Sequence, residues 1–411
     1  MKKLFALGAA CALALGLASC GEKKEGGSNV IKLEYSGTAS NKEFNESLFE
    51  AFKADRKAKG DPNTYEISYV EHGPDLVDSE VKDWEVGPDV FEFASDKITS
   101  LYEKGALAKV TGANADFVTE NNSEISVGLA TFNGDIYAYP YTGDNTYYLH
   151  YDKSILTEDD VKSMERILEV ANEEGKMVGY TLKTPFWGGG ALFTFGADYD
   201  MTFNADGAVE KIEANFNTEA GLKAAKAILK IVNDPAWQNT ATPPTPKNNL
   251  IACIDGTWET SKYKKELGDN YACAPMPTVT VDGDTKNLGA FLGGKLFGVN
   301  PQRSQGDVNR LVAAHQLAIF LSNKESQLAR FDDQNVAPCN IDASNESKVV
   351  NDINIKCLYE QAKFAHPQTA TPPKFWTAPE TLIVGMCDGT ITEDNLVEAL
   401  ETLNATIVDS K

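Results

Sequence analysis

The segment IYAYPYTGDNTYYLHYDKSIL, residues 136–156, carries six of the fifteen tyrosines of this 411-residue chain. These tyrosines flank a short polar break, TGDN, at residues 142–145. Tyr137 and Tyr139 alternate as residues of a β-strand do, and tyrosines on neighbouring strands can pair with them. The segment predicts either two strands with aromatic cross-strand pairs or the aromatic lining of a pocket for a polar ligand.

The chain before this segment alternates between strand and helix patterns. Three segments have the alternation typical of strands: VIKLEY at 30–35, YEISYVE at 65–71 and PDVFEF at 88–93. Between the first two, residues 41–60 place four apolar side chains on one helical stripe and end at a glycine. Strand-helix-strand order of this kind predicts an α/β fold with a parallel-rich sheet covered by helices on both faces.

The same alternation continues after the tyrosine-rich segment. Further helices are expected at 157–170, 218–234, 307–323 and 393–407, and further strands at 250–256 and 270–277. The triplet Asp282-Gly283-Asp284 resembles part of a calcium loop but lacks the later ligands, so it predicts a hairpin turn. A chain of this length exceeds what one hydrophobic core usually serves, which predicts two lobes.

The N-terminal residues are typical of an export signal. Lys2 and Lys3 precede an apolar run at residues 4–17 that is too short to span a bilayer. The run ends in LASCG, which resembles a bacterial lipobox. It predicts a signal peptide at 1–19, a lipidated Cys20 and a flexible tether at 20–29. We therefore expect a lipid anchor to hold the protein at the extracellular face of the cell membrane without spanning it. The alternative is an ordinary signal with an incidental cysteine.

The charge of the chain is strongly acidic. Sixty acidic residues stand against 38 basic ones, and loss of Lys2 and Lys3 with the signal changes the net charge from −22 to −24. Such a surface repels phosphate backbones, so nucleic acid is not expected as a partner.

The sequence contains no recognisable catalytic or metal-binding motif. Its four histidines show no zinc spacing, and nucleophile elbows and phosphate loops are absent from it. We therefore expect a binding protein rather than an enzyme, with no metal and no cofactor. Five cysteines remain in the mature chain besides Cys20, and we expect mostly buried thiols with at most one disulfide: Cys253, Cys273, Cys339, Cys357 and Cys387.

Four segments together resemble the family-one extracellular solute-binding proteins of ABC importers, the maltose-binding-protein-like family. They are YVEHGPDLV…ALAKVT at 69–111, FNGDIYAYPYTGDNTYYLHYDKSIL at 132–156, CIDGTWETSKY at 253–263 and PPKFWTAPETLIVGMCDG…LNATI at 372–407. The resemblance implies a two-lobed fold in which each lobe is a mixed sheet flanked by helices, with a ligand cleft between the lobes. It implies an N-lobe of residues 30–142 and 293–341 and a C-lobe of residues 146–288 and 349–411. The chain would cross between the lobes near 142–146, 287–294 and 342–351.

The resemblance also implies a set of ligand-binding residues: Ser36, Thr38, Phe93, Asp96, Asp144, Thr184, Phe186, Trp187, Trp258 and Trp376. These residue types suit a sugar, because flat aromatic rings cover its C–H faces while carboxylates bind its hydroxyl groups. Trp258 and Trp376 would be the two aromatic platforms, although core packing is the alternative for each. Asp144 would bind ligand directly, or it would cap the hinge instead.

Several positions depart from the family pattern. Thr184 stands where a Glu is found, Ala39 where a Lys is found, Glu380 where an Arg is found, and Phe93 replaces a Trp. These changes remove polar clamps, so the departures argue against maltose itself as the ligand, while a carbohydrate is still expected. The resemblance implies a monomeric receptor that captures a sugar or oligosaccharide and delivers it to an ABC permease by hinge closure. The alternatives are the same fold binding a polyamine, peptide or other small polar solute, or a surface-anchored carbohydrate-active enzyme.

Overall fold

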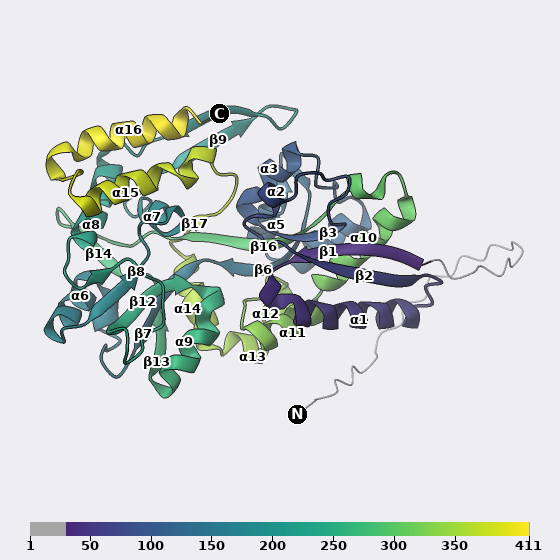
Figure 1. Ribbon diagram of the computed structural model, residues 1–411, viewed down its shortest axis with the longest axis horizontal. Coiled ribbons are helices and arrows are strands. Elements are labelled where there is room, and N and C mark those ends of the chain that lie inside the picture. Colours follow the sequence, from purple (N-terminus) through teal and green to yellow (C-terminus); the bar gives the residue numbers. More distant parts are fainter. Residues whose placement is uncertain (1–29, 411) are drawn as a thin grey trace, which may run out of the picture.

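The computed structural model describes residues 30–410, so the predicted signal peptide, Cys20 and tether lie outside the described residues. The described chain forms two α/β lobes, each built on its own mixed sheet, as the sequence predicts (Figure 1). We call the lobe around the six-stranded sheet the N-lobe and the lobe around the five-stranded sheet the C-lobe. The elongated strand β16 (Phe291–Val299) runs along the middle of the molecule between them (Figure 1).

The N-lobe sheet has the strand order β17-β16-β3-β1-β2, and β6 also pairs with β16. Its other strands are β1 (Val30–Gly37), β2 (Thr64–Glu71), β3 (Val90–Ala94), β6 (Tyr139–Asn145) and β17 (His366–Pro367). β1 is parallel to β2 and β3, whereas β16 is antiparallel to β3 and β6. The helices of this lobe are α1 (Lys42–Ala58), α2 (Val77–Glu80), α3 (Ile98–Glu103), α4 (Ala113–Asn121), α5 (Glu124–Leu129), α10 (Val308–Leu321) and α11 (Lys324–Gln334).

The C-lobe sheet has the strand order β11-β8-β12-β7-β13. Its strands are β7 (Tyr147–Asp152), β8 (Met177–Tyr180), β11 (Trp237–Gln238), β12 (Leu250–Gly256) and β13 (Tyr271–Ala274). Its helices are α6 (Met164–Glu173), α7 (Pro185–Ala191), α8 (Glu219–Val232), α9 (Thr260–Leu267), α14 (Ile353–Ala362), α15 (Ala378–Asp388) and α16 (Leu396–Val408). The short helices α12 (Ile341–Ser344) and α13 (Ser347–Val350) lead from α11 to α14.

Three hairpins complete the fold: β4 (Thr131–Phe132) with β5 (Asp135–Ile136), β9 (Tyr199–Phe203) with β10 (Val209–Ala214), and β14 (Thr278–Val281) with β15 (Asp284–Asn287). The predicted turn at 282–284 is confirmed, since Asp282 and Gly283 both have positive φ between β14 and β15. The β9–β10 hairpin reaches the N-lobe, where Phe203 packs edge-on against Phe132 with ring centroids 4.9 Å apart.

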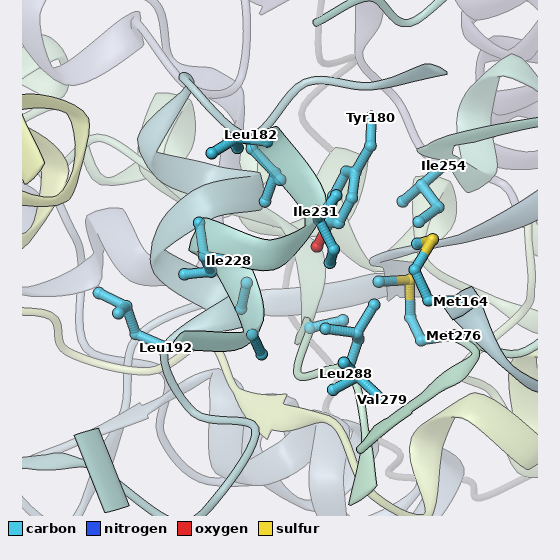
Figure 2. Close-up of a cluster of buried hydrophobic side chains, with 14 of the residues drawn as sticks. Met164, Tyr180, Leu182, Leu192, Ile228, Ile231, Ile254, Met276, Val279 and Leu288 are labelled. Carbon is cyan, nitrogen blue, oxygen red and sulfur yellow. The ribbon is translucent and has the colours of Figure 1, made fainter. Parts of the chain in front are cut away.

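The predicted helices form, with one shift in boundary. Thr157 and Asp160 make the expected reciprocal hydrogen bonds, but these close a short turn, and α6 starts only at Met164. The apolar side of α8 packs with α6, β8 and the β14 hairpin in the C-lobe core (Figure 2). Figure 2 shows Ile228 and Ile231 of α8 beside Leu182, Met276 and Val279.

The tyrosine-rich segment forms two strands in different sheets. β6 belongs to the N-lobe sheet and β7 to the C-lobe sheet, with only Thr146 between them. Five of the six tyrosines are almost fully buried on β6 and β7, and Tyr141 stacks on Phe297 at a centroid distance of 4.1 Å. The strand interpretation is therefore confirmed. Tyr137 differs from the prediction, because it lies between β5 and β6 and not within a strand.

β16 also passes from one lobe to the other. Phe291, at its start, packs in the C-lobe core, whereas Leu296 packs in the N-lobe core. The lobes are thus joined by neighbouring strands in the middle of the molecule. Such connecting strands can bend as hinges, because a few residues absorb the change in backbone angles.

Candidate functional site

Three of the predicted site residues lie in short 3-10 turns: Asp96, Trp258 and Trp376. Asp96 is in the short 3-10 turn η2 (Ser95–Lys97), directly after β3. Trp258 is in a similar turn, η4 (Thr257–Glu259), directly after β12, and Trp376 ends η7 (Pro373–Trp376). In open α/β sheets ligands bind outside the carboxyl ends of the strands, because the loops there are free to carry ligand-binding side chains.

Four aromatic rings form one surface on the C-lobe side. Phe186 and Trp187 of α7 lie 5.1 Å apart between centroids, and Trp258 lies 6.2 Å and 6.4 Å from them. Phe291 of β16 connects this group to Trp376, since its ring lies 5.6 Å from Phe186 and 5.5 Å from Trp376. Four of the five predicted aromatic residues are half-buried: Phe186, Trp187, Trp258 and Trp376.

Two lysines from the N-lobe sheet and its loops cover this aromatic surface. The Lys97 ammonium lies 5.8 Å from the ring centroid of Trp376, and the Lys295 ammonium lies 5.4 Å from that of Trp258. An ammonium group over an indole face is attracted by the ring quadrupole. The two tryptophans are therefore brought against the opposite lobe. We call Asp96, Lys97, Lys295, Phe186, Trp187, Trp258 and Trp376 the interlobe site.

Asp96 is the buried acid of this site. Its Oδ2 lies 3.4 Å from Lys97 Nζ, and its Oδ1 accepts a hydrogen bond of 2.8 Å from Gln368 Nε2. Burial raises the pKa of Asp96 to about 6, and the Lys97 charge opposes that rise. Asp96 therefore keeps its proton to a higher pH than an exposed aspartic acid does.

Asp144 lies at the crossing between the lobes. Its Oδ2 accepts a hydrogen bond of 2.7 Å from the Ala337 backbone, and its own carbonyl accepts one from the Thr257 hydroxyl. Burial raises the pKa of Asp144, against the opposing charge of Lys295. These contacts connect β6 to the segment after α11 and to η4. The Ala337 contact uses one of the two carboxylate oxygens, and both the ligand role and the hinge-capping role of Asp144 stay predictions.

Phe93 corrects one prediction. Its side chain has no exposed surface and packs against Phe91 in the N-lobe core, where the centroids are 5.8 Å apart. β3 is central in the sheet and buried on both faces, so neither face of this strand is available to a ligand. Phe93 is therefore a core residue in this structure, and the expected aromatic contact from β3 is missing.

The remaining predicted residues lie at or near the ends of secondary-structure elements. Ser36 is buried at the end of β1 with no partner for its hydroxyl group, and Thr38 follows it with a half-buried side chain. Thr184 is exposed at the N-terminus of α7. The glycines after Trp187 permit close packing, because a Cβ at Gly190 would lie 2.0 Å from Tyr147 Oη.

Sequence reasoning missed Lys97, Lys295 and Gln368. Lys97 follows Asp96 directly, so its charge beside a predicted acid was a usable signal. Gln368 is 272 residues from Asp96 in the sequence and donates a hydrogen bond to it. Its side chain also accepts a hydrogen bond of 2.6 Å from Asn145. Only the fold brings these residues together.

A groove of about 410 Å³ runs between the lobes beside this site. It is lined by α3 and the β4–β5 turn on one side and by β9 and residues 366–370 on the other. Ile98 and Pro367, which line it, are sequence neighbours of Lys97 and Gln368. None of the seven residues of the interlobe site lines this groove itself.

Two lobes joined by crossing strands, with aromatic and charged side chains gathered where the lobes meet, define a two-lobed ligand-binding protein. Comparison with known families agrees with that class. Residues 48–356 match the model of the bacterial extracellular solute-binding protein family, and the chain belongs to this family.

Two curated relatives match at low identity. The maltodextrin-binding protein MdxE of Bacillus subtilis (strain 168) is 25% identical, over 95% of this chain and 93% of its own length. A galactooligosaccharide-binding protein of the same strain is 23% identical, over 74% of this chain and 73% of its own length.

Solved structures show the same fold. A structure solved with acarbose matches with a TM-score of 0.79 and 26% identity, covering 93% of this chain and 100% of that one. The maltodextrin-binding protein MalE1 from L. casei BL23, solved without ligand, matches with a TM-score of 0.77 and 24% identity, covering 93% and 99%.

Across residues 30–410, no helix combines the length and apolar character that crossing a membrane requires. Within the same residues, no group of three or more His, Cys, Asp or Glu side chains is placed to hold a metal ion.

Proposed function

We propose that this protein is a lipid-anchored receptor that binds an oligosaccharide at the interlobe site and delivers it to an ABC permease. The observation that carries the proposal is the aromatic surface of Phe186, Trp187, Trp258 and Trp376 opposite Asp96 and two lysines. Aromatic faces stack on sugar rings while carboxylate and ammonium groups bind hydroxyl groups. The protein acts by binding and not by catalysis.

The charges of the site favour a neutral ligand. Lys97 lies beside Asp96, and Lys295 acts on Asp144, so each acid has a cation close to it. A polyamine would need an excess of carboxylates, and an acidic solute would need an excess of cations. The printed names of the relatives, maltodextrin-binding and galactooligosaccharide-binding, support a neutral oligosaccharide.

Closure about the crossing strands would follow ligand binding. A ligand that touches Trp376 and Trp258 on one lobe and Asp96 on the other binds the closed form better than the open form, and so shifts the population towards closure. Solution X-ray scattering of the monomer should show a modest decrease in the radius of gyration at saturating ligand. Identical curves would argue against hinge closure.

A thermal-shift screen tests the ligand class. The panel contains linear maltodextrins, galactooligosaccharides, polyamines and short peptides. A ligand present at 100 times its dissociation constant should add about 2.7 kcal/mol of stability. We expect stabilisation by an oligosaccharide only. Stabilisation by an amine or a peptide, with no effect of any oligosaccharide, would refute the proposal.

The lipid anchor on Cys20 has its own test. The wild-type protein should partition into the detergent phase of a Triton X-114 extract, because acyl chains hold it at the membrane. Cys20→Ala should be released or left unprocessed. A Cys20→Ala protein that stays anchored and is processed normally would contradict the anchor while leaving the sugar site untouched.

A further inference from the structure

Two thiols of the C-lobe lie on elements that pack against each other. Cys273 is on the edge strand β13, and Cys357 is on α14, which packs against β13. Cys273 is half-buried and Cys357 is buried, and both thiols are free. The two residues are 84 positions apart in sequence, so their proximity is a product of the fold.

The contacts on either side of the two cysteines fix how β13 and α14 are aligned. Tyr271 Oη donates a hydrogen bond of 2.7 Å to Asn354 Oδ1, and the Met276 backbone donates one of 2.8 Å to Gln361 Oε1. In the sequence, Cys273 lies between Tyr271 and Met276, and Cys357 lies between Asn354 and Gln361. Asn354, Cys357 and Gln361 share one helix face, because they are three and four residues apart. The two cysteines therefore face each other.

The position of the Cys273 sulfur confirms this alignment. Cys273 Sγ lies 3.5 Å from Asn354 Oδ1 and 3.8 Å from the Ile353 carbonyl oxygen, at the first turn of α14. Cys357 is one turn further along the same face. Burial raises the pKa of the Cys357 thiol well above its usual value, and the neighbouring Cys273 thiol raises it further.

We propose that Cys273 and Cys357 form an intramolecular disulfide once the protein is outside the cell. Two thiols on facing, closely packed elements meet the requirement that a disulfide forms without large backbone movement. Extracellular conditions permit such bonds to persist. The other buried thiols contact different groups: Cys253 lies against the Thr240 carbonyl, and Cys339 lies against Asn122 and Gln327.

The oxidation proceeds by exchange with a disulfide oxidant such as oxidised glutathione. Cys273 lines a surface crevice of about 980 Å³, so the oxidant reaches this residue first. The Cys273 thiolate attacks one oxidant sulfur, a mixed disulfide forms, and one glutathione thiol leaves. The Cys357 thiolate then attacks Cys273 Sγ and releases the second glutathione. Two protein thiols are oxidised and one oxidant disulfide is reduced to two thiols.

The bond would close a long loop without joining the lobes. The loop runs from Cys273 to Cys357 and contains β16 and α10 to α13. It therefore includes the part of the N-lobe that lies in the sequence between β13 and α14 of the C-lobe. Closing such a loop reduces the freedom of the unfolded chain and raises stability. Both cysteines lie in the C-lobe, so the bond leaves hinge motion free and ligand affinity unchanged.

Peptide mapping of the full-length protein tests the disulfide. The protein is treated with oxidised glutathione, its remaining thiols are blocked with N-ethylmaleimide, and it is digested with trypsin without reduction. We expect a cross-linked pair of peptides, residues 266–286 with residues 357–363, that separates on reduction. The melting temperature of the oxidised protein should exceed that of the reduced protein by about 5 °C. Cys357→Ser should lose this difference and Cys387→Ser should keep it.

Three results would overturn the proposal: N-ethylmaleimide on both cysteines after oxidation, a persistent glutathione adduct on Cys273, or pairing of either residue with another cysteine. If Cys357→Ser fails to fold, the peptide map of the wild-type protein decides alone. Neither experiment requires a ligand, so failure here leaves the proposed sugar site unaffected.

Discussion

Gln368 Nε2 donates a hydrogen bond of 2.8 Å to Asp96 Oδ1, and so connects the segment after β17 to the buried acid of the interlobe site. The same amide accepts from Asn145, which ends β6, and the Gln368 carbonyl accepts from Ser95. The buried Gln368 side chain thus contacts the turn after β3 and the end of β6. Gln368 holds the Asp96 carboxylate close to the end of β6.

Gln368→Ala should weaken both ligand binding and folding. Asp96 and Asn145 would each lose a buried partner, which costs about 1–3 kcal/mol of stability. Affinity for oligosaccharide should fall about fivefold or more, because Asp96 is no longer held in place. Calorimetric titration and urea unfolding measure the two effects.

Gln361→Ala is the matched control for Gln368→Ala. Gln361 is also a buried glutamine, and it accepts from the Met276 backbone in the C-lobe, away from the interlobe site. Its loss should reduce stability and leave affinity unchanged. If both variants lose stability but keep their affinity for oligosaccharide, Gln368 has no role in positioning Asp96.

Asp96 should make stability depend on pH. Its pKa rises from 3.8 to about 6 on folding, so between these values the folded state holds a proton that the unfolded state releases. The stability that protonated Asp96 contributes is fully present below about pH 4. It falls by about 3 kcal/mol as the pH rises from about 4 to about 6. Asp96→Asn should therefore be more stabilising at about pH 7.5 than at about pH 4, as measured by urea unfolding.

Asp284→Asn is the control, because the pKa of Asp284 is lowered where that of Asp96 is raised. Its carboxylate is exposed, and a hydrogen bond from Lys223 lowers its pKa, so neutralising it should bring no gain at neutral pH. An Asp96→Asn variant whose stability relative to wild type does not change with pH would show that Asp96 titrates normally.

Trp258→Ala and Trp376→Ala should lose binding without losing stability. Each indole contacts ligand through a face that is now covered only by a lysine, so truncation should cost about 2–4 kcal/mol of binding, or about thirty- to a thousandfold in affinity. Trp84→Ala is the core control. Trp84 is buried against Phe91, and its removal should cost about 3–5 kcal/mol of folding stability. Site variants that melt as early as Trp84→Ala but bind normally would identify these residues as core.

Arg330 should be the most sensitive charge of the N-lobe. It is 1% exposed, lies over the Tyr141 ring at 4.7 Å, and donates to Asn45 Oδ1, while Asn45 Nδ2 donates to buried Glu92. Arg330→Met would leave Glu92 without a nearby cation and should cost about 3–5 kcal/mol in urea unfolding.

Two comparisons check the role of Arg330. Adding Glu92→Gln should restore part of the lost stability, because the uncompensated charge is removed. Lys348→Met, which removes an exposed ion pair with Asp332, should cost less than about 1 kcal/mol. A double variant no more stable than Arg330→Met would show that the two charges are not coupled.

The sequence allowed the fold class to be predicted, whereas the ligand role of the predicted aromatic residues stays a prediction. Alternating patterns identified most strands, and the resemblance of two segments to a known family singled out Trp258 and Trp376 as aromatic platforms. Phe93 could not be placed, because a strand buried on both faces gives no alternation that separates core from ligand side. Lys295 lies on a strand otherwise buried throughout, so its approach to Trp258 depends on how β16 crosses between the lobes.

A crystal structure with a bound oligosaccharide tests the central claim most directly. The oligosaccharide is the best stabiliser from the thermal-shift screen. We expect sugar rings stacked on the indole faces of Trp258 and Trp376, with the Lys97 and Lys295 ammonium groups displaced from those faces and Asp96 bonded to a hydroxyl group. A sugar bound elsewhere, for example in the crevice between β13 and residues 153–162, with both lysines still over the tryptophans, would contradict the account.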